Sequence, residues 1–416
     1  MNSLPFNSAG IALGLGARAA VVTGAYVAAG VAILLTVIVL RGIVAPAALR
    51  AVLAFIFMAT LSSGLEPATV KAAALGEGGV EAHGAGAYLT VSALKGLLGA
   101  PVLAVIWRFA DPSVAPVDLL WTPLVTIAGF GATDLRVLLD LRGRHGLAIA
   151  LKQGSLAGGV VVLGLAVAMK APLTLAIGVS TLARLVGLAV AARLAEGGVD
   201  WMRTWRAARR LLGDWRWLEL AAISVIATAG GSIDRVFGLR LLSPADYSGY
   251  YLTYEILSKF WLLPYLLGPI MFARQANGDD GRAFARGAWA LTAASAVAFL
   301  AGVAGVMAFV PSLLVRVVGA SFGVATLVFA LGVAVSAFVQ LHVAQLQGAG
   351  RARVAVAAMG LAAVVTAPLL YLAAARYGAP GLLWAFLAKV ILEVGFLAIG
   401  ERWPRRFSAR RSAARI

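Results

Sequence analysis

The sequence predicts an all-α membrane protein with about twelve transmembrane helices, because long apolar runs alternate with short polar segments along the whole chain. Apolar residues make up 61% of the 416 residues. Charged residues make up only 13%, which is about half of their usual share in soluble proteins. These proportions exclude a soluble enzyme, and a chain without cysteine cannot be a disulfide scaffold.

The spans are placed by apolar runs that end at charged residues, proline or glycine. Each run is close to the roughly 20 residues that a helix needs to cross a bilayer. The expected spans are about 20–40, 47–65, 87–107, 117–133, 154–170, 172–192, 217–237, 248–272, 287–310, 321–341, 354–374 and 380–400. No connection between these spans is long enough for a sizeable extramembrane catalytic domain, so we expect a protein that is not an enzyme.

The chain is strongly basic, with 35 Lys and Arg against 18 Asp and Glu and a net charge of +17. If the N-terminus lies inside, most of these cations fall on cytoplasmic segments, as is usual for membrane proteins. The charge therefore needs no nucleic-acid partner. It also indicates an even number of spans, with the N- and C-termini both cytoplasmic.

The most polar stretch, 193–217, divides six expected spans from six. Two halves of equal span number are common among secondary transporters. We therefore expect an N-lobe at 1–192, a linker at 193–217, a C-lobe at 218–401 and a basic cytoplasmic tail at 402–416.

The linker carries Trp and other apolar residues at helical spacing, with arginines on the remaining positions. This pattern predicts an amphipathic helix that lies in the plane of the lipid headgroups, with Trp at the interface and Arg on lipid phosphates. A helix that docks on a partner protein is the alternative. The expected lipid-interface residues are Trp201, Trp205, Arg206, Arg209 and Arg210.

Five cations lie inside expected spans: Lys95, Arg184, Arg235, Lys259 and Lys389. Each charge costs roughly 2.5–3.5 kcal/mol at the middle of a membrane on insertion scales, so these side chains must face a hydrated cavity or pair with acids.

Two of these cations have an acid four residues away on the same span, because Glu255 precedes Lys259 and Glu393 follows Lys389. This spacing predicts intrahelical ion pairs. Lys95 and Arg184 have no acid within a helical turn of their own spans, which predicts a cavity that receives an anion. The three histidines are scattered and no phosphate-binding loop of the GxxxxGK[ST] type occurs, so we expect neither a metal nor another cofactor.

Three segments of the second half carry a resemblance to a known family. Residues 231–274 place Asp234 and Arg235 near the end of a span, followed by the loop LSPADYSGY and a span that ends in Pro and Arg. Residues 347–351 read QGAGR and residues 377–381 read YGAPG. Together these segments resemble the Wzx-type polysaccharide, or O-antigen, flippases of the MOP superfamily. Pro380 departs from the pattern, because a small residue is commoner there.

The resemblance implies two six-helix lobes around a central cavity in the bacterial inner membrane. It implies alternating access that moves an undecaprenyl-diphosphate-linked oligosaccharide from the cytoplasmic to the outer leaflet, for surface polysaccharide biosynthesis. We expect Lys95, Arg184, Arg235 and Lys259 to contact the diphosphate or sugar phosphate, with Asp234 and Glu255 as counter-charges or ion-coupling groups.

The expected partners are this lipid-linked oligosaccharide, a bilayer with anionic headgroups and, as candidates, polysaccharide polymerase or chain-length proteins. Two other functions stay open. A MATE-like antiporter of small molecules or cations would favour acids in its cavity, whereas cations outnumber acids within these spans. A polytopic glycan polymerase or ligase usually needs a larger outer loop than the sequence offers.

Overall fold

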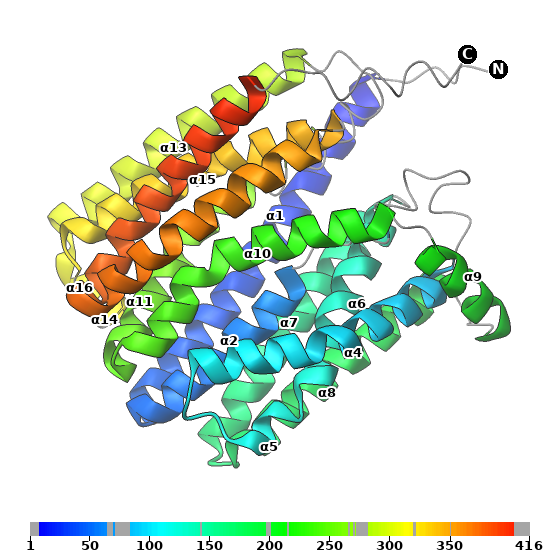
Figure 1. Cartoon of the computed structure of the whole chain (residues 1–416), viewed down its shortest axis with the longest axis horizontal. Helices are drawn as coiled ribbons and strands as arrows, with labels where there is room; N and C mark the ends of the chain where they lie inside the picture. Colours follow the sequence, from blue (N-terminus) through cyan, green and yellow to red (C-terminus); the bar gives the residue numbers. More distant parts are fainter. Residues whose placement is uncertain are drawn as a thin grey trace. The chain divides into compact units, whose positions relative to one another are not determined.

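A computed structural model describes residues 8–64, 70, 84–141, 144–196, 201–213, 216–264, 267–268, 271, 282–318, 322–349 and 351–402 (Figure 1). Within these residues the secondary structure is helical, and no strand occurs. The basic tail expected at 402–416 lies almost wholly outside the described residues.

The helices of the first half coincide with the expected spans. They are α1 (Ser8–Ile43), α2 (Pro46–Gly64), α4 (Ala85–Ala110), α5 (Pro116–Leu119), α6 (Thr122–Leu141), α7 (His145–Ala168) and α8 (Leu173–Glu196). The linker contains α9 (Trp201–Gly213). The fourth span is displaced, because α6 continues to Leu141 whereas the sequence analysis ended it near residue 133.

The helices of the second half are α10 (Arg216–Leu241), α11 (Pro244–Leu257), the 3₁₀ turn η2 (Ser258–Trp261), α13 (Arg282–Phe309), α14 (Pro311–Val318), α15 (Val324–Gly348) and α16 (Ala352–Arg402). The short helix α14 was not expected. The eleventh and twelfth spans are continuous in α16 except at Gly378, whose φ of 64° is a left-handed conformation that glycine adopts without strain.

Helix starts follow local sequence chemistry. Helices α2, α5, α11 and α14 begin with proline, which is favoured there because the first turn of a helix does not use its backbone N–H groups. At α11 the Ser243 hydroxyl oxygen also accepts a hydrogen bond of 3.1 Å from the backbone N–H of Asp246. Part of the motif LSPADYSGY is therefore an N-terminal helix cap.

Seven helices among the described residues are long and apolar enough to cross a membrane. Shorter apolar segments occupy Val27–Ile43 in α1 and Gly154–Ala168 in α7.

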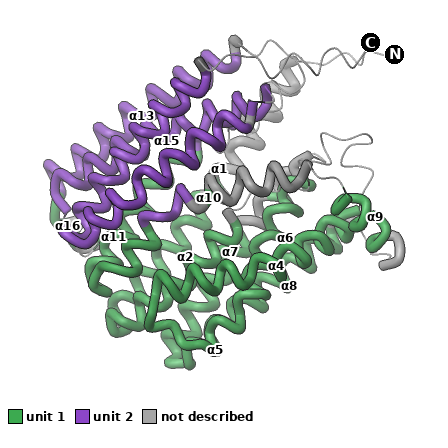
Figure 2. The backbone as a smooth tube through the Cα atoms, viewed as in Figure 1, with its two compact units in different colours: residues 1–228, 235–262, 311–321 green, residues 229–234, 263–310, 322–416 purple. Residues whose placement is uncertain are grey.

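The chain forms two compact units, which Figure 2 shows in different colours. Unit 1 comprises residues 1–228, 235–262 and 311–321, and unit 2 comprises residues 229–234, 263–310 and 322–416. In unit 1, α4 packs along α6, α7 packs along α1 and α8, and α9 packs on α4. In unit 2, α15 packs against α16 and α13, and the rings of Phe329 and Phe386 lie 4.8 Å apart.

Small residues allow the close packing of unit 1. A Cβ atom built on Gly96 of α4 would lie 2.8 Å from the backbone nitrogen of Ile127 on α6. The backbone carbonyl of Gly96 accepts a hydrogen bond of 2.7 Å from the Thr126 hydroxyl. The two backbones are therefore in direct contact, as is typical of membrane helices that meet at glycine.

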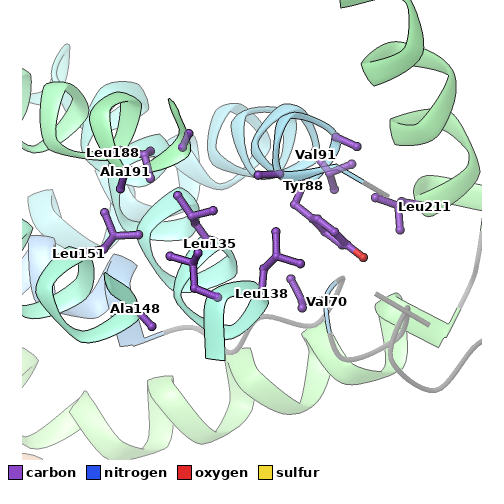
Figure 3. Close-up of a cluster of buried hydrophobic side chains, with 14 of the residues drawn as sticks. Val70, Tyr88, Val91, Leu135, Leu138, Ala148, Leu151, Leu188, Ala191 and Leu211 are labelled. Atoms are coloured by element: carbon purple, nitrogen blue, oxygen red, sulfur yellow. The ribbon is translucent and has the colours of Figure 1, made fainter. Parts of the chain in front are cut away.

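A core cluster joins five helices of unit 1, α4, α6, α7, α8 and α9 (Figure 3). Tyr88 and Val91 of α4 and Leu135 and Leu138 of α6 are buried in it, together with Leu211 of α9. The linker helix is thus attached to the helix pair that carries the first candidate site.

Candidate functional site

Lys95 is held by a carboxylate that the sequence analysis did not assign to a span. Its Nζ lies 2.6 Å from Oδ2 of Asp134 on α6, and the Ser92 hydroxyl donates to the same oxygen at 2.5 Å. Lys95 is 12% exposed and Asp134 2% exposed at the side chain. Lys95 has no acid within a helical turn of its own span, as expected, but it is paired with an acid on another helix and does not leave an unpaired cation for an anion.

A sequence signal for Asp134 exists in the residues that follow it. Leu135, Leu138 and Leu139 are all buried and continue the apolar pattern of α6 beyond residue 133. Extending the fourth span by one helical turn would have placed Asp134 inside it. Asp134 is 39 residues from Lys95 in the chain, and a pair so far apart leaves no local pattern that predicts it.

Arg184 on α8 is buried, with 2% of its surface exposed, and has no carboxylate partner among the described residues. Its Nη2 donates a hydrogen bond of 2.8 Å to the Ser63 hydroxyl oxygen on α2. Its Nε and Nη1 have no hydrogen-bond partner among the residues that the structure describes. A buried guanidinium with open donors can bind an anion strongly, because few other groups screen or neutralise it.

A groove of about 270 Å³ lies between α7 and α8. Gly159 lies both in its lining and against Arg184, since a Cβ atom on Gly159 would be 2.7 Å from Cγ of Arg184. The Ser180 hydroxyl on α8 also donates to the Gly159 carbonyl at 2.7 Å, which ties the two helices together. The groove is lined by Leu151, Gly154, Ser155, Gly158, Gly159, Val162, Ala183 and Gly187.

Arg235 on α10 is buried between two aromatic rings. Its guanidinium carbon lies 4.8 Å from the ring centre of Phe57 on α2 and 4.6 Å from that of Tyr254 on α11. Both distances are within the range of cation–π attraction. The rings hold the guanidinium in place without removing its charge.

The predicted pair of Glu255 and Lys259 is confirmed, with 2.7 Å between Oε2 and Nζ. Lys259 lies on η2, where the α-helical pattern is interrupted, and 51% of its side chain is exposed. The Tyr251 hydroxyl is hydrogen-bonded to Glu255, and Arg235 is close enough to act on the same carboxylate. Gly30 of α1 lies beside the Lys259 side chain, since a Cβ atom built on Gly30 would be 3.2 Å from Cε of Lys259.

Buried tyrosines on α11 were missed by the sequence reasoning. Neighbouring rings of Tyr247, Tyr250 and Tyr254 have centres 6.4 Å apart, and Tyr254 meets Trp261 at 5.8 Å. Tyr247, Tyr250 and Tyr254 are three and four residues apart, which is the spacing that places them in one aromatic stripe along a helix.

Two further predictions concern charged residues of unit 2, the pair of Lys389 and Glu393 and the carboxylate of Asp234. The predicted pair of Lys389 and Glu393 is confirmed at 3.2 Å, with both side chains buried. Asp234 is fully buried, and it lies about two turns before the end of α10 instead of at the end of a span. Among the described residues, no three His, Cys, Asp or Glu side chains are grouped as metal ligands would be.

The apolar face of α9 differs from the expected one. Thr204, Ala208 and Leu211 are buried against the protein, whereas Trp205 is 52% exposed. Arg206, Arg209 and Arg210 are exposed, and the side chain of Trp201 lies outside the described set.

Comparisons with known proteins place the fold. No protein-family model and no curated protein matches the sequence. The structure is similar to the eukaryotic MATE transporter AtDTX14, with a TM-score of 0.62 and 16% identity over 96% of this chain and 98% of that one. It is similar to the lipid II flippase MurJ, with a TM-score of 0.62 and 11% identity over 92% and 87% of the chains.

A MOP-superfamily transporter from Pyrococcus furiosus is also similar, with a TM-score of 0.55 and 12% identity over 93% of this chain and 92% of that one. The predicted all-α fold, of the kind found in MOP-superfamily transporters, is therefore confirmed.

Proposed function

We propose that the chain is a flippase for an undecaprenyl-diphosphate-linked oligosaccharide. It acts in the bacterial inner membrane, with both termini cytoplasmic, and supplies surface polysaccharide biosynthesis. The observation that carries the proposal is Arg184, a buried guanidinium without a carboxylate partner among the described residues. A diphosphate is a dense anion whose oxygens fit the donor geometry of a guanidinium.

The groove between α7 and α8 supports a lipid-linked substrate. Its lining consists mainly of glycine and aliphatic residues, which suits an isoprenyl chain that stays in contact with the bilayer. Gly159 lines this groove and also packs against the Arg184 side chain, so in the proposal a phosphate linked to a chain in the groove reaches the guanidinium when α7 and α8 move apart.

The remaining cations act as secondary contacts in the proposed cycle. Lys95 and Lys259 are paired with Asp134 and Glu255, so each must exchange a carboxylate for the substrate phosphate when it binds. The net gain in binding free energy is then only the difference between the new ion pair with phosphate and the lost ion pair with the carboxylate. Arg235 keeps its charge among aromatic rings and contacts the substrate in the same proposal.

The acids then provide counter-charges while the cavity is empty. Glu255 has this role for Lys259 in the proposal, and we add Asp134 for Lys95. Asp234 is retained as an ion-coupling candidate because it is a fully buried carboxylate.

Flipping in proteoliposomes tests the proposal. The probe is a fluorescent sugar on undecaprenyl diphosphate, and dithionite reports which leaflet contains it. Arg184→Ala should slow flipping by about 10-fold to 100-fold, the range for a charged hydrogen bond. Arg184→Lys should retain part of the rate, and Arg193→Ala, which alters an exposed arginine on the same helix, should retain all of it. Wild-type flipping by folded Arg184→Ala would refute the role of Arg184.

A MATE-like cation antiporter is the second candidate. The buried carboxylate of Asp134 and the similarity of fold to MATE transporters favour it. The same proteoliposomes can be loaded with an organic cation such as ethidium and given a proton or sodium gradient. Gradient-driven ethidium efflux without movement of the glycan lipid would establish the antiporter and exclude the flippase.

A further inference from the structure

The linker helix α9 has two sides with different surroundings. Its inward side is formed by Thr204, Ala208 and Leu211, which are buried. Its outward side carries Trp205, Arg206, Arg209 and Arg210, all exposed, and we name these four residues the basic face.

Protein contacts fix the orientation of this helix. Ala208 and Leu211 belong to the same core cluster as Tyr88 and Val91 of α4, and Figure 3 shows Leu211 beside these two side chains. A free amphipathic helix would turn its apolar side toward lipid. Here that side is already occupied by α4, so the basic face is directed away from the protein core.

Short connections tie α9 to the two helices on either side of it in the chain, α8 and α10. Residues 197–200 separate it from α8, which contains the membrane-span candidate Leu173–Leu194. At about 3.5 Å per residue, this connection spans at most roughly 17 Å. On the other side, α10 begins at Arg216, three residues after Gly213. The helix therefore cannot move far from the level at which α8 leaves the membrane.

We propose that the basic face is a docking surface for anionic phospholipid headgroups of the membrane in which the protein resides. Three guanidinium groups on adjacent turns complement a layer of phosphates. The indole of Trp205 favours a bilayer over nucleic acid or an acidic protein, because tryptophan is enriched at the headgroup level of membranes. The surface is separate from the residues assigned to transport, and its test does not depend on any transport activity.

The chain has no cysteine, so one introduced thiol can be labelled uniquely. Gly213→Cys places a fluorophore at the end of α9, at an exposed residue with open space around its Cβ position. The full chain is reconstituted in bilayers of phosphatidylcholine and phosphatidylglycerol in one fixed ratio. Bromine, which quenches the fluorophore, is carried either on the anionic or on the zwitterionic lipid at the same mole fraction.

The wild-type face should gather the anionic lipid, so brominated phosphatidylglycerol should quench more strongly than brominated phosphatidylcholine. Replacing Arg206, Arg209 and Arg210 with glutamine should bring the ratio of the two quenching constants to about one. Replacement of the same three residues with lysine should preserve the preference, which shows that the charge is responsible and that the helix is still folded.

A matched triple substitution to glutamine at the exposed Arg193, Arg286 and Arg376 controls for net charge and should leave the ratio unchanged. Equal quenching by the two lipids in the wild-type background would overturn the proposal. A preference that survives the glutamine triple at α9 would overturn it as well, and so would a loss of preference in the control triple alone.

Discussion

Replacing Gly159 with alanine should destabilise the protein, whereas the same change at the neighbouring Gly158 should not. At position 159 the new Cβ atom would lie 2.7 Å from Cγ and 2.8 Å from Cδ of Arg184. Carbon atoms in favourable contact are about 3.5–4.0 Å apart. No atom lies within 4 Å of the Cβ position on Gly158.

The magnitude follows from what Arg184 loses when it moves. Overpacking costs about 1–3 kcal/mol, and loss of the charge-assisted bond from Arg184 to Ser63 costs about 1.5–3 kcal/mol. Alanine regains up to about 1 kcal/mol of helix propensity at either position. Because that gain is the same at both positions, the two variants should differ by about 2.5–6 kcal/mol.

Heating the purified variants and measuring the folded fraction by fluorescence-detected size exclusion checks this difference. Gly159→Ala should lower the Tm by roughly 5–12 °C relative to Gly158→Ala. Adding Arg184→Ala to Gly159→Ala removes the clash, so the double variant should be more stable than the sum of the single effects predicts. Equal Tm values for the two alanine variants would show that Arg184 does not pack on Gly159.

Three other substitutions follow from single contacts of unit 1. Lys95→Ala leaves the carboxylate of Asp134 buried alone and should destabilise the protein by about 3–5 kcal/mol; a further Asp134→Ala should restore much of the Tm, and no restoration would contradict the pairing. Tyr254→Leu removes one ring from Arg235 and should cost about 0.5–2 kcal/mol, while Tyr254→Phe keeps the ring face and should be close to neutral in the same heating assay. Ser243→Ala removes the cap of α11 and should cost about 1 kcal/mol; Ser243→Thr keeps a hydroxyl that can accept from the Asp246 N–H and donate to the Asp246 carboxylate, so it should retain most of the stability, and equal loss with both variants would place the cause elsewhere.

The sequence predicts the helices well because each span must be apolar over its full length. Most expected spans coincide with described helices, although the fourth is displaced and the eighth is helical as α11 only to Leu257. The pair of Glu255 and Lys259 was found because the two residues are four apart in the sequence. Contacts between helices were not accessible in this way. The pair of Lys95 and Asp134 joins two spans, and no local pattern specifies which helices pack together.

Other misses have local causes. The helix α14 is only eight residues long, which is too short for periodicity to separate it from a loop. The basic residues of the linker predicted an amphipathic helix, but its apolar side is set by contact with α4, and a single sequence does not reveal that contact.

The contact between α4 and α6 determines how the pair of Lys95 and Asp134 can separate. Gly96 follows Lys95 directly, and its backbone touches Ile127 and accepts the Thr126 hydrogen bond. Sliding of one helix along the other would break this contact, so mechanical shear is a costly way to open the pair. A competing anion that binds the ammonium group can separate the pair while both backbones stay in place.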